Sequence, residues 1–252
     1  MKAKESRVML VTGGGRGIGA ATARLAAQAG YAVAVNYHAD RASAERLVEE
    51  LKAAKAKAIA VRADVAVEAD ILNLFRQVDS ALGRVTALVN NAGIVDKGMR
   101  VELMSGARLA RMFAVNVTGT ILCAREAVKR MSRRLGGAGG AIVNVSSIAA
   151  RLGAPGEYVD YAASKGAVDT FTVGLAKEVG PDGIRVNAVR PGIIRTEIHA
   201  SSGDPGRLER IGAMAPLGRP GEAEEVARTI LWLLSDEASY LTGALVDVSG
   251  GR

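Results

Sequence analysis

Several residue types on which particular functions depend are scarce in this sequence. Its 252 residues include a single cysteine, Cys123, which excludes an internal disulfide and a cysteine-based zinc site. The two histidines, His38 and His199, have no partners at metal-ligand spacing, so no metal is expected. No apolar run approaches the ~18 residues that span a membrane, and residues 1–7 lack the apolar core of a signal peptide. The sequence therefore predicts a cytoplasmic protein without a metal or a membrane partner.

Acidic residues are outnumbered by basic ones, and the formal net charge is +7. A basic protein can bind nucleic acid, but the Lys and Arg residues are scattered among acids, except for Arg130, Arg133 and Arg134. The sequence also lacks a recognised nucleic-acid reader motif. We therefore expect no nucleic-acid partner, and we interpret the excess charge as a solvated surface that mildly favours phosphorylated ligands.

Aromatic residues make up only 4% of the chain, but hydrophobic residues make up 49%, which is enough for a sizeable core. Short apolar runs predict strands at residues 8–11, 32–36, 58–61, 87–89, 141–145, 184–189 and 244–248. Helical patterns occupy the segments between them, at residues 20–29, 43–54, 70–82, 109–134, 161–179 and 222–234. This alternation predicts a doubly wound parallel sheet of seven strands, the Rossmann fold.

No linker or shift in composition divides the chain, so we expect a single domain over residues 1–252. Residues 195–221 are its least regular part, and an irregular segment of this length is typical of a lid over a substrate site. In a doubly wound sheet, ligands bind at the carboxyl ends of the strands, where the winding reverses.

A glycine-rich turn follows the first predicted strand, with the sequence Thr12-Gly13-Gly14-Gly15-Arg16-Gly17-Ile18-Gly19. Glycines let the chain turn sharply and let a phosphate approach bare N–H groups at the start of a helix. The spacing is Gly13-xxx-Gly17-x-Gly19, and Gly15-x-Gly17-xx-Ala20 also fits the looser dinucleotide fingerprint. No Gly-Lys-Ser/Thr follows, which excludes a nucleoside-triphosphate P-loop.

The end of the second predicted strand bears on the choice between NAD and NADP. An NAD-specific protein usually carries an acid there to hold the ribose 2′-hydroxyl. This chain instead has Asn36, Tyr37 and His38, and its first carboxylate is Asp40. Arg16 lies in the glycine turn and Arg41 lies just beyond Asp40. The missing acid and the nearby arginines favour a 2′-phosphate, so NADP (NADPH) is expected and NAD is less favoured.

The pair Tyr161 and Lys165 opens the long helix predicted at residues 161–179. Residues four apart share a helix face, so the phenol and the ammonium can point into one cleft. The nearby positive charge is expected to lower the phenol pKa and so to suit Tyr161 for acid–base chemistry. On its own, the same spacing also fits an exposed tyrosine beside a solvated lysine.

Other small or polar groups follow the strand ends: Asn90-Asn91-Ala92-Gly93, Ser146-Ser147 and Pro191-Gly192. Asn116 lies in the middle of a predicted helix, where asparagine is unfavourable. It is either a satisfied buried amide or a residue that bends the helix and binds water near a site.

Together these motifs resemble those of the short-chain dehydrogenase/reductase family, over essentially the whole chain. The matching pieces are Thr12-Gly13…Gly17-Ile18-Gly19, Asp64, Asn90-Asn91-Ala92-Gly93, Asn116, Ser147, Tyr161-xxx-Lys165 and Pro191-Gly192. The resemblance implies reversible hydride transfer between a nicotinamide cofactor and a carbonyl or alcohol substrate. The glycine turn with Arg16 resembles the NADP-preferring group, which includes 3-oxoacyl-ACP reductase-like and glucose dehydrogenase-like members.

The resemblance also implies roles for single residues. Tyr161 matches the general acid/base, Ser147 the residue that holds the substrate oxygen, Lys165 the lysine on the nicotinamide ribose, and Asn116 the anchor of a relay water. The cofactor-binding residues expected on the same ground, or from the strand ends above, are Gly13, Gly15, Arg16, Gly17, Ile18, Gly19, Asn36, Tyr37, His38, Asp64, Val65, Asn91, Ala92, Gly93, Tyr161, Lys165, Pro191, Gly192, Ile194 and Thr196.

Relatives of this family are usually homotetramers or homodimers, so a homo-oligomer is expected. Two alternatives remain open: a sugar or alcohol dehydrogenase rather than a ketone or oxoacyl reductase, and a protein that binds NADP without catalysis. Because strand residues alternate in direction, only one of Ser146 and Ser147 can face the cleft, and the family pattern favours Ser147.

Overall fold

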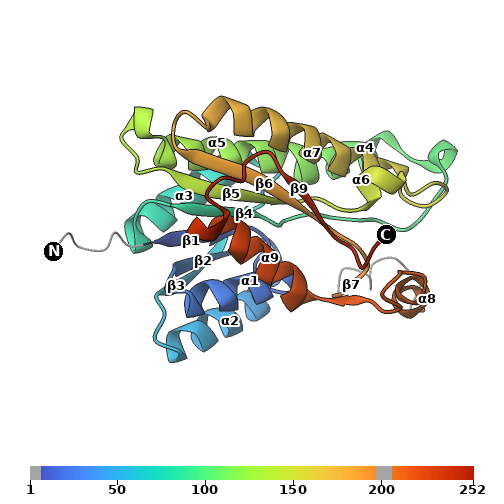
Figure 1. Cartoon of the computed structure of the whole chain (residues 1–252), viewed down its shortest axis with the longest axis horizontal. Helices are drawn as coiled ribbons and strands as arrows, with labels where there is room; N and C mark the ends of the chain where they lie inside the picture. Colours follow the sequence, from blue (N-terminus) through green and yellow to red (C-terminus); the bar gives the residue numbers. More distant parts are fainter. Residues whose placement is uncertain (1–6, 197–205) are drawn as a thin grey trace.

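A seven-stranded parallel sheet forms the centre of the protein, with helices on both faces (Figure 1). The computed structural model describes residues 7–196 and 206–252. The strand order is β3-β2-β1-β4-β5-β6-β9. The strands are β1 (Val8–Val11), β2 (Ala32–Tyr37), β3 (Ala58–Arg62), β4 (Ala87–Asn90), β5 (Gly140–Val145), β6 (Ile184–Pro191) and β9 (Leu245–Val248). The winding reverses between β1 and β4, as the predicted doubly wound fold requires.

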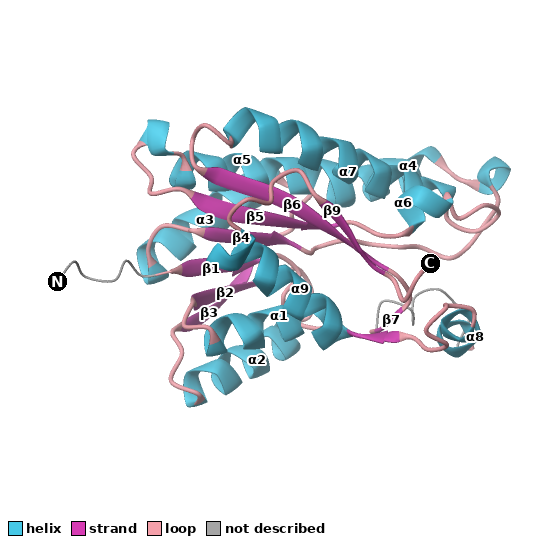
Figure 2. Cartoon of the chain, in the orientation of Figure 1, coloured by secondary structure: helices cyan, strands magenta, loops and turns pink. Residues whose placement is uncertain are grey.

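Two helix layers cover the sheet and bury both of its faces, as Figure 2 shows. One layer contains α1 (Gly17–Gln28), α2 (Arg41–Ala53) and α9 (Ala223–Leu234). The other contains α3 (Glu68–Leu82), α4 (Gly106–Phe113), α5 (Thr120–Met131) and α7 (Val159–Val179). Alternate residues of β1 enter the two cores: Met9 and Val11 pack with the first layer, Val8 and Leu10 with the second. This explains why the strands are apolar throughout rather than alternating.

The predicted fold is confirmed, and the predicted strands and most helices agree with the structure to within a few residues. The helix predicted at 109–134 differs most. It starts at Gly106, contains the π-helical turn η2 (Ala114–Gly119), and ends at Met131 before the short 3-10 turn η3 (Arg133–Leu135). The π turn lies where the Asn116 side chain bonds to the Ile94 backbone, in addition to a contact with Met112 one turn earlier.

The segment predicted to be irregular, residues 195–221, contains more structure than expected. Arg207–Ala213 forms α8, and β7 (Ile194–Arg195) pairs in parallel with β8 (Gly221–Glu222). Residues 197–205, and with them His199, lie outside the described part of the chain. The short helix α6 (Ala149–Leu152) and the 3-10 turns η1 (Val101–Leu103) and η5 (Asp236–Ala238) were also not predicted, because such short helices have no periodic pattern. None of the helices in the described residues has the length and apolar content to cross a membrane.

The turns that carry the predicted site residues lie at the carboxyl edge of the sheet. Figure 1 shows the start of β1 at one end of the sheet and α8 with the C-terminus at the other. The glycine turn after β1, the Asn90–Gly93 turn after β4, Ser147 after β5 and Gly192 after β6 all follow strand ends, so they meet at one edge.

The close approach of the π turn to the loop after β3 generates a stability prediction. A Cβ on the buried Gly119 would lie 2.6 Å from the Val65 carbonyl oxygen, so Gly119→Ala must push backbone apart. We expect the variant to lower Tm by about 5 °C. The matched control is Gly174→Ala in α7, where nothing lies within 4 Å of the added Cβ. This control should leave Tm unchanged or raise it, since alanine favours a helix. Equal Tm values for the two variants would contradict the packing described.

Candidate active site

A cavity of about 740 Å³ opens at the carboxyl edge of the sheet. All the predicted cofactor-binding residues line it except Gly19, which packs beneath the turn. Three of the four predicted catalytic residues, Ser147, Tyr161 and Lys165, also line it, while Asn116 lies buried behind the wall. One cavity therefore gathers residues that lie far apart in the sequence.

The glycine turn brings bare backbone to the cavity. Gly13 and Gly17 have φ angles of 59° and 53°, a region that favours glycine. A Cβ on Gly19 would lie 2.6 Å from both the Asn91 amide nitrogen and the Gly13 carbonyl oxygen. Helix α1 begins at Gly17, and within the described chain no side chain caps its start. Its first N–H groups and its dipole therefore suit a phosphate, so the residues present fit a dinucleotide.

Two asparagines that were predicted to bind the cofactor hold this turn in place. Asn36 accepts a hydrogen bond from the Gly13 backbone N–H (3.2 Å) and donates one to the Ala63 carbonyl (3.1 Å). The Asn91 amide donates to the carbonyls of Thr12 and Gly13, both at 2.9 Å. Because these amides are used by the backbone, they support the turn, and the ligand-facing surface there is main chain.

Tyr37 and His38 at the end of β2 line the cavity, as does Arg16 of the glycine turn. Asp40 also lines it, but its carboxylate caps α2 by accepting from the Ser43 backbone N–H (3.0 Å), which lowers the Asp40 pKa. Arg41 does not line the cavity and donates instead to Glu45 (2.7 Å). Of the two arginines considered from the sequence, Arg16 is therefore the one in position to meet a ligand.

Asp64 is fixed at the adjacent wall by three partners. Its carboxylate accepts from the Ala66 backbone N–H (2.9 Å) and from Arg111 (3.1 Å), and His38 lies 3.6 Å away. Burial would raise the Asp64 pKa, but these partners outweigh it and hold the pKa below its usual value. The role of Arg111, on α4, was not predicted, because the two residues are 47 apart in the sequence.

Tyr161 and Lys165 face the cavity from the first turns of α7. The Lys165 ammonium lies 5.7 Å from the centre of the Tyr161 ring and donates to the Val145 carbonyl (2.8 Å) at the end of β5. Burial lowers the pKa of Lys165 to about 8, with Asp169 opposing the shift. The lysine is a buried group with one strong backbone partner, and not the solvated surface cation that the spacing alone allowed.

The Tyr161 phenol differs from the sequence-based expectation in one respect. Burial raises its pKa above the usual value, and a hydrogen bond with Ser147 only partly opposes this. In the chain alone, Lys165 does not lower the pKa of the phenol as expected. Spacing along a helix shows which groups are neighbours, but it does not show how deeply a phenol is buried. Ser147 is the serine that meets Tyr161, whereas Ser146 is buried and donates to the Lys165 carbonyl (3.2 Å).

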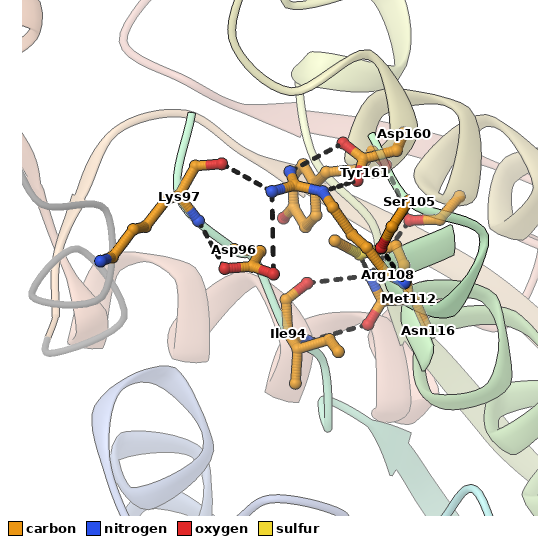
Figure 3. A network of polar contacts seen from close by, with 10 residues as sticks. Ile94, Asp96, Lys97, Ser105, Arg108, Met112, Asn116, Asp160 and Tyr161 are labelled. Atoms are coloured by element: carbon orange, nitrogen blue, oxygen red, sulfur yellow. Dashed lines mark hydrogen bonds and ion pairs between the residues drawn. The ribbon is translucent and has the colours of Figure 1, made fainter. Parts of the chain in front are cut away.

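Asn116 lies in η2, and Figure 3 shows it beside Ile94 and Met112. Its side-chain oxygen accepts from the Ile94 N–H (2.8 Å), and its nitrogen donates to the Ile94 carbonyl (3.0 Å) and to Ser164 Oγ (3.1 Å). It is thus a satisfied buried amide in a π-helical turn, which is the first of the two alternatives that the sequence left open, and the relay water stays a prediction. A Cβ on Gly93 would lie 3.4 Å from both Asn116 Oδ1 and Lys165 Nζ, so the two side chains flank the same turn.

Part of the cavity wall comes from residues with no sequence signal. Arg207 of α8 pairs with Glu157 (2.7 Å) and lies 5.0 Å above the Tyr158 ring, and Arg252 lines the cavity from the C-terminus. An arginine in an irregular segment or at a chain end belongs to no periodic pattern, so only the folded chain reveals it. Within residues 7–196 and 206–252, no three His, Cys, Asp or Glu side chains are grouped to hold a metal.

Comparisons with known proteins agree with this arrangement. A family model described as Enoyl-(Acyl carrier protein) reductase matches residues 13–252. The Escherichia coli (strain K12) protein named "Uncharacterized oxidoreductase YgfF" is 54% identical over 245 residues, which cover 97% of this chain and 99% of the relative.

Solved structures share the fold over nearly the whole chain. A short-chain dehydrogenase/reductase from Serratia marcescens is 35% identical, with a TM-score of 0.89 and 97% of each chain covered. A blue fluorescent protein from a metagenomic library, in complex with NADPH, is 33% identical, with a TM-score of 0.89 and 97% of each chain covered. A 3-ketoacyl-(acyl-carrier-protein) reductase from Brucella melitensis, complexed with NADH, is 34% identical, with a TM-score of 0.90 and 99% of each chain covered.

The family predicted from the sequence motifs is therefore confirmed: the chain belongs to the short-chain dehydrogenase/reductase family of oxidoreductases.

Proposed function

We propose that this enzyme transfers hydride between NADP(H) and a carbonyl or secondary alcohol, with Tyr161 as the general acid/base. The observation that carries the proposal is the meeting of Ser147, Tyr161 and Lys165 at one wall of the cavity whose other end is the glycine turn. A phosphate cradle and a proton donor in one cavity are what a nicotinamide-dependent reduction requires.

Each side chain has a distinct task in the reducing direction. The nicotinamide cofactor, when bound, supplies the hydride. Ser147 and Tyr161 donate hydrogen bonds to the substrate oxygen as it gains negative charge, and Tyr161 gives up its proton. The raised pKa of Tyr161 keeps the phenol protonated at neutral pH, which suits a donor. Lys165, held by the Val145 carbonyl, places a positive charge where it stabilises the phenolate that remains.

The first test replaces the phenol. Tyr161→Phe should lower kcat for reduction of a ketone by about 1,000-fold, since a positioned acid contributes roughly 10²–10⁴-fold. Its Kd for NADPH should stay within about twofold of the wild type, because the ring is kept and only one hydrogen bond of modest net strength is lost. The matched control is Tyr158→Phe, a second tyrosine on the same cavity, which should retain most activity. Turnover is followed by NADPH absorbance over a panel of carbonyl substrates. Normal turnover by Tyr161→Phe on a true substrate would overturn the assigned role.

The preference for NADP over NAD is proposed from the charges around the β2 end. Arg16 lines the cavity there, and the carboxylate of Asp40, which also lines it, caps α2. The related structures include complexes with NADPH and with NADH, so the preference rests on this chain's own residues.

A pair of arginine variants tests this preference. Arg16→Ala should lower kcat/KM for NADPH by about 10- to 100-fold, the loss expected for a charge-assisted hydrogen bond, and should leave kcat/KM for NADH nearly unchanged. Arg41→Ala is the control, because Arg41 pairs with Glu45 and does not line the cavity. A wild-type enzyme that prefers NADH, or an equal loss with both cofactors in Arg16→Ala, would refute the argument.

We also propose that residues 195–221 act as a lid over the substrate. Arg207 of α8 lies on the Tyr158 ring and pairs with Glu157, which ties the described part of this segment to the cavity wall. Lining side chains such as Ile148, Leu152 and Ile211 are apolar, so the substrate end of the cavity favours a carbonyl with an apolar substituent.

A homo-oligomer is proposed from the outer surface of α4 and α5. Leu109, Phe113 and Ile121 are 38%, 38% and 39% exposed on these consecutive helices. Light scattering should give a mass that is two or four times the 26.1 kDa of one chain. Phe113→Glu should shift the protein towards the monomer, because a carboxylate cannot be buried there without a partner. A wild-type protein that is monomeric at micromolar concentration would contradict the proposal.

A further inference from the structure

A buried ion pair lies directly beside the proposed acid/base. Asp160, the residue before Tyr161, has a side chain with 0% exposure, and its partner Arg108 has a side chain with 6% exposure. Arg108 donates to both carboxylate oxygens, with distances of 2.7 Å from Nε to Oδ2 and 3.3 Å from the terminal nitrogen to Oδ1. The pair joins the first turn of α4 to the first turn of α7 (Figure 3).

Local helix preferences do not explain Arg108. It lies in the first turn of α4, where the helix dipole disfavours a cation. Burying two charges is also costly, and apolar side chains of similar size often stabilise a fold equally well. Burial alone would raise the Asp160 pKa, but Arg108 and the backbone N–H of Tyr161 outweigh it and hold the pKa below its usual value. The buried Asp160 carboxylate therefore depends on Arg108 for the stabilisation of its charge.

The same guanidinium also holds the loop after β4. Arg108 donates to the Lys97 carbonyl (2.7 Å), and Asp96 lies 3.7 Å away. A few residues earlier, the Ile94 backbone is held at both its N–H and its carbonyl by Asn116. Ile94 and Val95 line the cavity. Arg108 thus connects the cavity wall at residues 94–97 with the helix turn that carries Tyr161.

Ser164 makes a second contact, which fixes the Tyr161 backbone. Ser164 Oγ donates to the Tyr161 carbonyl (2.7 Å) and accepts from Asn116 (3.1 Å). Residues 160 and 161 are therefore anchored to α4 and η2 through Arg108 and through Asn116, and both anchors also grip residues 94–97. If the two walls of the site moved apart, hydrogen bonds of both Arg108 and Asn116 would break.

We propose that Arg108 and Asp160 are positioning residues that set where the Tyr161 phenol stands relative to Ser147 and the cavity. The inference rests on the proposed function of Tyr161. Neither side chain touches the reacting atoms. The pair acts by orienting the first turn of α7, and a displacement of about 1 Å at a reacting group can cost about 100-fold in rate.

The test replaces both charges at once, with Arg108→Met combined with Asp160→Leu. Because the double variant leaves no unpaired buried charge, it should fold with a Tm close to that of the wild type. Its Kd for NADPH should also be unchanged, since neither residue lines the cavity. We expect kcat to fall by about 10- to 100-fold with little change in KM. Amide exchange should become faster at residues 94–97 and 160–165, a readout that does not depend on activity.

The matched control is a similar pair away from the site. Arg130 on α5 donates to Asp79 on α3 at 2.7 to 3.0 Å. Arg130→Met combined with Asp79→Leu should retain the wild-type kcat, with no faster exchange at residues 94–97 or 160–165. Arg108→Lys serves as a second variant with less risk to folding. It keeps the charge balance but lacks the planar fork, so it should fold normally and still lose part of kcat.

Three results decide the matter. A double variant that folds, binds NADPH and turns over at the wild-type rate overturns the positioning role, as does Arg108→Lys with a wild-type kcat. Tyr161→Phe is measured in parallel: if it is inactive while the double variant is fully active, only the positioning role fails. If Tyr161→Phe is itself fully active, the proposed function fails and the inference fails with it.

Discussion

The Lys165 ammonium is buried at the end of β5, where it donates a 2.8 Å hydrogen bond to the Val145 carbonyl. A charge in such a place is costly, and the lowered pKa of about 8 reflects that cost. The bond to β5 fixes α7 against the sheet, so that Tyr161, one turn earlier, faces the cavity beside Ser147. The chemistry proposed for this enzyme depends on that one placement.

Other features of the fold serve the same edge of the sheet. The reversal of strand order between β1 and β4 leaves a crevice, and the glycine turn fills its rim with bare N–H groups. Asn36 and Asn91 hold the glycine turn by hydrogen bonds to its backbone. Asn116 and Arg108 hold the cavity wall at residues 94–97 in the same way. Because these polar side chains bond to the backbone of the turns that line the cavity, they give it a defined shape before any ligand binds.

The sequence predicts the sheet well because its strands are apolar on both faces and are separated by clear helical patterns and glycine stops. It also brings Ser147, Tyr161 and Lys165 together, since parallel strands end at a common edge. It does not predict the Arg108–Asp160 pair, whose members are 52 residues apart, or the π turn at Asn116, which depends on a tertiary bond to Ile94. The raised pKa of Tyr161 was missed for a similar reason: helix spacing shows which groups are neighbours, and burial is set by the whole fold.

The central claim is that Tyr161 ionises within the site and that its ionisation is governed by nearby positive charge. An ultraviolet titration of the tyrosines, with and without saturating NADP+, tests this most directly. The oxidised nicotinamide ring carries a positive charge, which together with Lys165 favours a phenolate. We expect one tyrosine to ionise at distinctly lower pH when NADP+ is bound, and we expect this change to be absent from Tyr161→Phe. A wild-type titration that NADP+ leaves unaltered, or a change that survives in Tyr161→Phe, would contradict the account.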